Sequence, residues 1–110
     1  MTVLLKSKMQ VEVSKRAQRQ WLRILVYYNE MGGERAAAKL HQKYLQKQKR
    51  LLKYPESGSP EPLLRDRKIR YRSVIINEYY KMVYYVKGNV LRVAAFWDMR
   101  MHPDNLRKTI

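Results

Sequence analysis

Residues 79–97 read YYKMVYYVKGNVLRVAAFW, and this stretch decides the fold class. Two runs rich in Val, Tyr and Phe, Tyr79–Val86 and Val90–Trp97, are separated by a short segment that contains Gly88-Asn89. Aromatic and β-branched residues favour extended backbone, and a Gly-Asn pair suits the tight turn between two strands. The stretch therefore predicts an antiparallel β-hairpin.

The two faces of this hairpin differ in charge. Side chains alternate along a strand and opposed residues of a regular pair share a face, so pairing Lys81 with either Ala94 or Phe96 gives the same division. The uncharged face is expected to pack on helices, and it holds Tyr80, Met82, Tyr84, Val86, Leu91, Val93, Ala95 and Trp97. The other face, which helices are not expected to cover, holds Lys81, Val83, Tyr85, Arg92, Ala94 and Phe96.

Two helices are predicted on the N-terminal side of the strands. The first begins after Ser14 and ends at Gly32-Gly33, and the second runs over Glu34–Lys53 and is ended by Pro55. The pair forms an αα-hairpin with a basic outer face. One apolar stripe of the first helix consists of Ala17, Trp21, Ile24, Leu25 and Tyr28.

The remaining segments complete an α+β fold. Val11 and Val13 alternate with polar residues and predict a first strand, and Tyr71–Asn77 predicts a third strand beside the hairpin. We expect an N-terminal strand, the αα-hairpin and three antiparallel strands in one twisted sheet, with the helices packed on one face. Because Met9 offers an alternative start, residues 1–8 are expected to be a flexible extension and residues 9–110 a single domain.

Composition narrows the class of protein. The chain has 110 residues, of which 45% are hydrophobic and 30% charged, which suits one compact domain. It contains no cysteine, so disulfides and thiolate metal sites are excluded, and no cluster for another metal or a cofactor stands out. No apolar run reaches the roughly 18 residues of a membrane span, and the N-terminus is charged too early for a signal peptide. We therefore expect a cytoplasmic protein without a cofactor.

The charge indicates a polyanionic partner. There are 24 Lys and Arg residues against 9 Asp and Glu, a net charge of +15. Such a field attracts polyanions and accelerates their encounter with the protein. Nucleic acid, a ribosome surface or an acidic protein are the expected partners, whereas a basic surface that only maintains solubility is the simpler alternative. A membrane is not expected as a partner, since no lipid-facing apolar helix is apparent.

Three short motifs, in this order, resemble the RelE/ParE toxin superfamily. They are Tyr54-Pro55-Glu56-Ser57-Gly58, Tyr80-Lys81-Met82-Val83-Tyr84 and Phe96-Trp97-Asp98-Met99-Arg100. Each alone is only a helix end, a strand or a strand end. The resemblance lies in their order, spacing and basic background, and it extends from about Met9 to Leu106.

The resemblance implies a toxin of a type II toxin–antitoxin pair, whose partner is an acidic antitoxin. Superfamily members divide between ribosome-dependent mRNA endonucleases and non-enzymatic inhibitors of DNA gyrase, and fold does not choose between them. The basic sheet face favours the endonuclease acting on mRNA at the ribosome. The Pro-Glu-Ser-Gly loop is more typical of ParE, so gyrase inhibition stays open as the alternative.

Three residues are candidates for catalysis if the chain cleaves RNA. Metal-independent cleavage needs groups that activate the 2′-hydroxyl, stabilise phosphorane charge and protonate the leaving oxygen. By resemblance Lys81 and Arg100 match basic residues of RelE-like enzymes, and His102 is a nearby acid or base. Leu106 stands roughly where RelE has a C-terminal tyrosine. Structural alternatives are that Lys81 is an ordinary strand lysine, that Arg100 pairs with Asp98 or Asp104, and that His102 is solvated.

A second group of cations is expected to contact phosphate. A dense run of basic residues leads into the predicted strand Tyr71–Asn77, and a further arginine lies in the last strand. In this background contact with RNA is as reasonable as a solvated surface. These candidate RNA- or phosphate-binding residues are Arg65, Arg67, Lys68, Arg70, Arg72 and Arg92.

Overall fold

A computed structural model describes residues 9–110, which form one α+β unit. The sheet has the strand order β1-β5-β4-β3-β2, in which β1 is parallel to β5 and the other neighbours are antiparallel. The predicted fold class is therefore confirmed, while the predicted extension, residues 1–8, lies outside the described residues. The elements are β1 (Gln10–Val13), α1 (Lys15–Gly32), α2 (Glu34–Lys53), β2 (Ser59–Pro60), the 3₁₀ turn η2 (Pro62–Leu64), β3 (Arg72–Ile75), β4 (Tyr80–Lys87), β5 (Val90–Asp98) and α3 (Pro103–Thr109).

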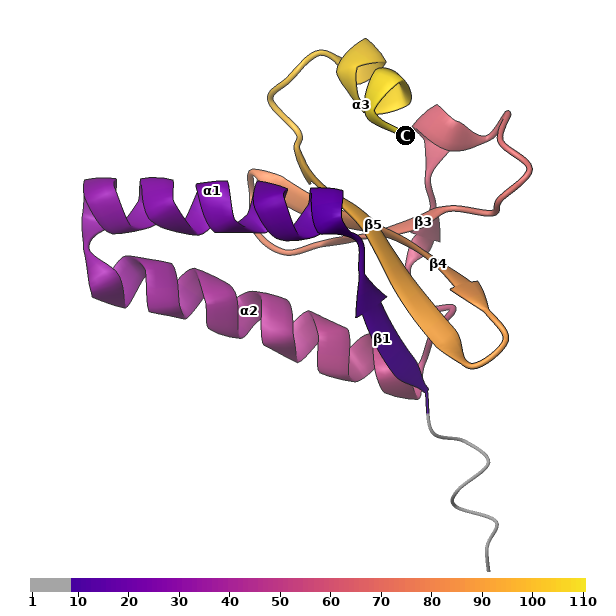
Figure 1. The fold of residues 1–110 in the computed structure, drawn as a ribbon, viewed down its shortest axis with the longest axis horizontal. Helices are drawn as coiled ribbons and strands as arrows, with labels where there is room; N and C mark the ends of the chain where they lie inside the picture. The colour runs from indigo at the N-terminus through magenta and orange to yellow at the C-terminus, as the bar shows by residue number, and fades with distance from the viewer. Residues whose placement is uncertain (1–8) are drawn as a thin grey trace, which may run out of the picture.

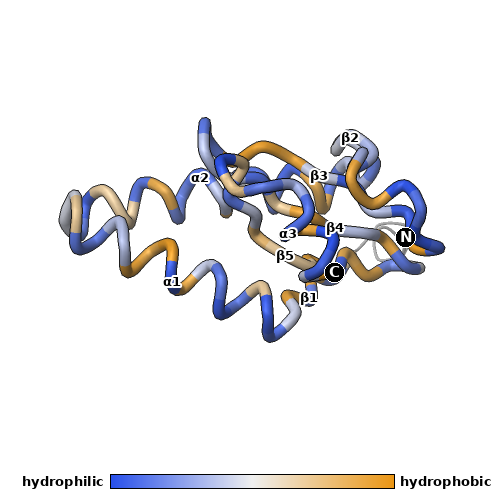
Figure 2. The backbone as a smooth tube through the Cα atoms, turned by 90° about the horizontal axis from the view of Figure 1, so that it is seen from above, coloured by the Kyte–Doolittle hydropathy of each residue, from blue (hydrophilic) through white to orange (hydrophobic). Residues whose placement is uncertain are grey.

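The helices α1 and α2 lie side by side as an antiparallel hairpin that reaches beyond the sheet (Figure 1). Ser14 caps α1 by accepting a hydrogen bond from the Ala17 amide at 3.1 Å. Gly33, with a φ of 86°, separates the two helices in a backbone conformation that favours glycine. Hydrophobic and hydrophilic residues alternate along both helices (Figure 2), so one side of each is available for packing.

The main core lies between the helical hairpin and one face of the sheet. Phe96 stacks on Trp21 with ring centroids 4.6 Å apart and meets Tyr44 edge-on at 5.1 Å. Such aromatic contacts stabilise the fold beyond the effect of removing the rings from water. The buried residues of this core are Ala17, Trp21, Leu40, Tyr44, Leu51, Ile76, Tyr80, Met82, Tyr84, Leu91, Val93 and Phe96.

A bulge in β5 overturns part of the predicted division between the two sheet faces. Strands β4 and β5 shift register at Ala94, which has no opposite residue. Beyond it Val83 pairs with Ala95, and Lys81 pairs with Trp97 rather than with Ala94 or Phe96. Because an extra residue reverses the alternation of side chains, the predictions for the end of β5 are inverted. Phe96 faces the helical hairpin, whereas Ala95 and Trp97 face away from it.

A second apolar cluster covers part of the sheet face that points away from the helical hairpin, around Val83 of β4 and Trp97 of β5. Helices were not expected to cover this face. The helix α3, not predicted from the sequence, folds back toward η2, and Figure 1 shows the C-terminus beside that turn. The expectation of an uncovered face is wrong there, because α3 and η2 pack on this face, where the bulge places Trp97 instead of Phe96. The buried residues of this cluster are Leu64, Val83, Ala95, Trp97 and Leu106.

The Pro-Glu-Ser-Gly loop is tied to the sheet by the Tyr84 hydroxyl. This group donates to the Pro55 carbonyl at 2.7 Å and accepts from the Gly58 amide at 3.0 Å. A Cβ on Gly58 would lie 2.4 Å from that hydroxyl and 2.9 Å from the Ser73 carbonyl oxygen. Glycine is therefore required at position 58 for the loop to approach the sheet this closely.

Candidate functional site

Lys81 faces away from the helical hairpin, as predicted, but its charge is engaged inside the protein. Its Nζ lies 2.5 Å from Oε1 of Glu61, a residue only 2% exposed. The other carboxylate oxygen of Glu61 accepts a hydrogen bond from the Leu63 amide at 3.0 Å. Since the Lys81 side chain is itself only 14% exposed, this is a largely desolvated ion pair, in which the ammonium neutralises the buried carboxylate.

Arg100 is held on the helix side of the sheet rather than beside Lys81. Its guanidinium donates to both carboxylate oxygens of Asp98 at 2.9 Å, lies 4.2 Å from the ring centroid of Tyr79 and contacts the Tyr80 hydroxyl at 3.4 Å. This hydrogen bonding lowers the pKa of the Asp98 carboxyl. The structural alternative, in which Arg100 pairs with Asp98, is the arrangement found.

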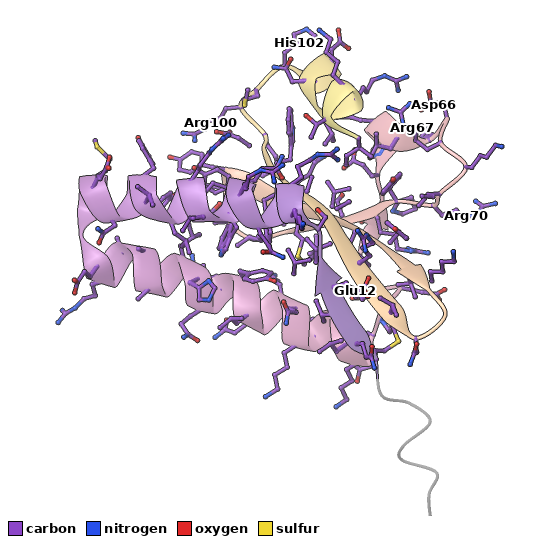
Figure 3. All side chains as sticks on the ribbon, in the orientation of Figure 1. Glu12, Asp66, Arg67, Arg70, Arg100 and His102 are labelled. Carbon is purple, nitrogen blue, oxygen red and sulfur yellow. The ribbon has the colours of Figure 1, made fainter. Side chains whose placement is uncertain are left out.

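His102 lies in the exposed connection that leads into α3. Its Nδ1 accepts a hydrogen bond from the Asp104 amide at 3.2 Å, so the imidazole caps the helix. The side chain is 71% exposed. Figure 3 shows His102 beside α3 and Arg100 above α1, so the structure does not gather Lys81, Arg100 and His102 around one point.

The basic run before β3 surrounds a cavity of about 440 Å³. Arg72 donates to the Gly58 carbonyl at 2.7 Å, and Arg67 donates to the Arg107 carbonyl at 2.7 Å, so both are used to hold backbone segments. The other three cations of the run are exposed, and Figure 3 shows Arg70 pointing away from the protein. Within residues 9–110 these three form no ion pair; they are Arg65, Lys68 and Arg70.

Arg92 belongs to a second basic cavity, of about 370 Å³, that the sequence did not indicate. It pairs with Glu12 at 2.8 Å across the parallel strands β1 and β5. Arg16 and Arg19, from the first turns of α1, line the same cavity together with two tyrosines. The spacing of the two arginines places them on one helix face, but only the packing of α1 beside β5 brings them to Arg92. Those tyrosines are Tyr71 and Tyr85.

In the part of the chain from Met9 onward, no three His, Cys, Asp or Glu side chains are grouped closely enough to hold a metal ion. No helix within that same part combines the length and the apolar character needed to cross a membrane.

The strand, helical hairpin and antiparallel sheet, with this dense positive charge, define a small basic toxin of the RelE/ParE superfamily. Residues 11–103 match the family described as the ParE toxin of the type II toxin–antitoxin system parDE, and the chain belongs to that family. It is therefore a toxin whose partner is an antitoxin.

A solved structure supports the fold. The chain is similar to one in the structure titled "Chromosomal ParDE TA system from P. aeruginosa", with a TM-score of 0.66 and 17% sequence identity. The likeness covers 84% of this chain and 97% of that chain. At this identity the match bears on the fold alone. Comparison with curated protein sequences gives no match.

Proposed function

We propose that the chain is a non-enzymatic inhibitor of DNA gyrase, the alternative left open by the sequence. The observation that carries this proposal is the ion pair between Lys81 and Glu61. Withdrawing the ammonium toward a substrate phosphate would leave a buried carboxylate unpaired, at a cost of about 3–5 kcal/mol. Lys81 is therefore better suited to stabilising the fold than to stabilising a transition state.

The positions of the other two candidate catalytic residues support the same proposal. General acid–base cleavage requires its groups to reach one phosphate within hydrogen-bond distance or through one water. Arg100 is bound to Asp98 on the helix side, and His102 caps α3 in solvent. Membership in the ParE family adds support, because the resemblance implies gyrase as the target of ParE-like members.

The proposal implies a place of action and a mode of control. A toxin that acts on gyrase works where DNA is supercoiled, in the cytoplasm. Its net charge of +15 suits an acidic antitoxin, which would cover the basic surface and keep the toxin inactive.

A direct comparison of targets tests the proposal. The purified chain is added to a gyrase supercoiling assay and, separately, to a translation reaction with a defined mRNA. We expect loss of supercoiling, with the mRNA intact and translation unaffected. Cleaved mRNA together with normal supercoiling would overturn the proposal and restore the endonuclease.

A double variant distinguishes a structural role of Lys81 from a catalytic one. The double variant Lys81→Met with Glu61→Gln removes both charges of the buried pair and should still fold. We expect it to arrest growth on induction as the parent does, whereas a catalytic Lys81 would make it harmless. His102→Gln, which changes an exposed side chain, should also remain toxic.

A further inference from the structure

The two basic cavities are parts of one tract, which follows the sheet face opposite the helical hairpin and reaches the N-terminal turns of α1. Tyr71 lines both of them, and it packs against the cluster beneath α3. Burial raises the pKa of the Tyr71 phenol, while Arg67, from one cavity, and Arg16, from the other, oppose that shift. Because Tyr71 lines both cavities, it lies between the cations of one and those of the other.

The cations of this tract are largely free to bind a ligand. In the region described by the structure, five of them form no ion pair with a carboxylate. Of the acidic groups nearby, Glu61 is neutralised by Lys81, and Asp66 by Arg107 at 2.8 Å. The five unpaired cations are Arg16, Arg19, Arg65, Lys68 and Arg70.

A sixth cation, Arg92, is paired but can exchange its partner. Both Arg92 and Glu12 have exposed side chains, and an exposed ion pair of this kind contributes little to stability. A phosphate could therefore replace the carboxylate of Glu12 at small cost.

Two aromatic rings lie among these cations. Tyr71 and Tyr85 meet edge to face with centroids 5.5 Å apart, and each is half-buried, so part of each ring remains accessible. Nucleic-acid bases stack on such rings whatever their sequence, while cations along a groove follow the phosphates. An acidic peptide uses the cations but gains little from the rings.

We propose that this tract binds single-stranded nucleic acid, with bases against Tyr71 and Tyr85 and phosphates along the arginines on either side. A duplex fits less well, because its bases are stacked on each other and unavailable to the tyrosines. The site is independent of the gyrase proposal, since binding a strand requires neither the enzyme nor cleavage.

Fluorescence anisotropy tests the tract directly. Labelled 12-nucleotide strands of thymidine (DNA) and uridine (RNA) are titrated with the purified chain at several salt concentrations, alongside a duplex of equal length. We expect both single strands to bind more tightly than the duplex. The logarithm of affinity should fall with the logarithm of salt at a slope of about −3 to −4 for five phosphate contacts. Preference for one strand chemistry would identify DNA or RNA as the ligand, and equal binding of the duplex would overturn the proposal.

Charge-matched variants locate the site. Arg16→Gln with Arg19→Gln alters two exposed residues and should weaken single-strand binding about tenfold at 100 mM salt. Lys43→Gln with Lys49→Gln removes the same charge from exposed positions of α2 and should change it less than about twofold. Equal losses in both variants would mean that net charge alone attracts the strand, and the proposal would fail.

Two further measurements address the rings and the competing ligand. Tyr85→Leu, checked for folding by circular dichroism, should weaken single-strand binding while leaving the salt slope unchanged, since stacking releases no counterions. If it does not fold, Tyr85→Phe, which keeps the ring, is expected to bind as the parent does. Competition by polyglutamate as effective as that by unlabelled thymidine strand would identify an acidic protein as the ligand and contradict the proposal.

Discussion

Lys81 and Glu61 show how a residue's surroundings decide its role. The pentapeptide Tyr80–Tyr84 around Lys81 resembles a catalytic strand, yet the ammonium lies against a carboxylate that has lost its contact with water. Glu61 comes from the loop before η2, far from Lys81 in sequence. Lys81 is therefore the counter-charge of a buried carboxylate and not an exposed cation.

This pair yields a stability prediction. Lys81→Met should lower the free energy of unfolding by about 3–5 kcal/mol, because Glu61 stays buried without a counter-charge. Adding Glu61→Gln should recover most of that loss, within about 1–2 kcal/mol of the parent. Urea denaturation of the three proteins measures both steps. A single variant as stable as the parent would mean that the pair is open to solvent.

At the scale of the element, the bulge at Ala94 determines what β5 contributes to each face. It turns Phe96 toward the helices and Trp97 toward α3, so one strand supplies a large aromatic ring to each of two cores. A regular strand would exchange the two rings, with Trp97 toward the helices and Phe96 toward the opposite face. The bulge therefore decides which of the two rings packs on α1 and α2 and which packs beneath α3.

The bulge also predicts a large effect at a position that a regular strand would turn away from the helical hairpin. Phe96→Ala removes the ring that stacks on Trp21 and should cost about 3–5 kcal/mol of stability. Val86→Ala, at a residue 38% exposed on the same hairpin, should cost less than about 1 kcal/mol. Guanidinium unfolding of both variants gives the comparison, and similar small losses would indicate that Phe96 does not contact the helices.

The whole molecule carries nine tyrosines, and burial protects several of them from ionising. Desolvation raises the phenol pKa of Tyr44, Tyr71, Tyr80 and Tyr84 above the ordinary value of 10.0. The folded state then keeps protons that the unfolded state releases above pH 10. Stability that is fully present below pH 10 is therefore lost as the pH rises through the folded-state values.

We accordingly expect alkaline unfolding. These phenols stay protonated in both the folded and the unfolded state between pH 7 and pH 9, so they should not change the denaturant midpoint there. The midpoint should fall above about pH 10. Titration followed by phenolate absorbance should show some tyrosines ionising late in the folded chain and all together in denaturant. Tyr84→Phe should reduce the slope of stability against pH, although it also removes the hydrogen bond to Pro55. An unchanged midpoint at pH 11 would contradict the assignment.

The net charge leads to a prediction about the antitoxin. We expect the neighbouring gene to encode a small protein with an acidic C-terminal half that folds on the toxin. Its association rate should fall as salt is raised from 50 to 500 mM, by about tenfold or more, because steering between opposite charges is screened. Stopped-flow mixing measures this rate. A rate independent of salt would show that the charge plays no part in the encounter.

The sequence by itself determined the elements whose signals are local. Three of these signals depend on near neighbours: the apolar stripe of α1, the break at Gly32-Gly33 and the strand-forming run around Tyr80. Together with the net charge, they predicted the fold class and the superfamily. Local periodicity and turn chemistry suffice for such features, because each is satisfied within a few residues.

Tertiary structure alone decided which side chains meet. The bulge at Ala94, the return of α3 and the burial of Glu61 each depend on contacts between distant segments, so no local pattern announces them. In the tertiary structure Arg100 is bound to Asp98, away from Lys81. Arg16 lines one cavity with Tyr71 and Arg92. A single inserted residue reverses a strand's faces without changing its composition, and this is why the strands could be predicted while the site could not.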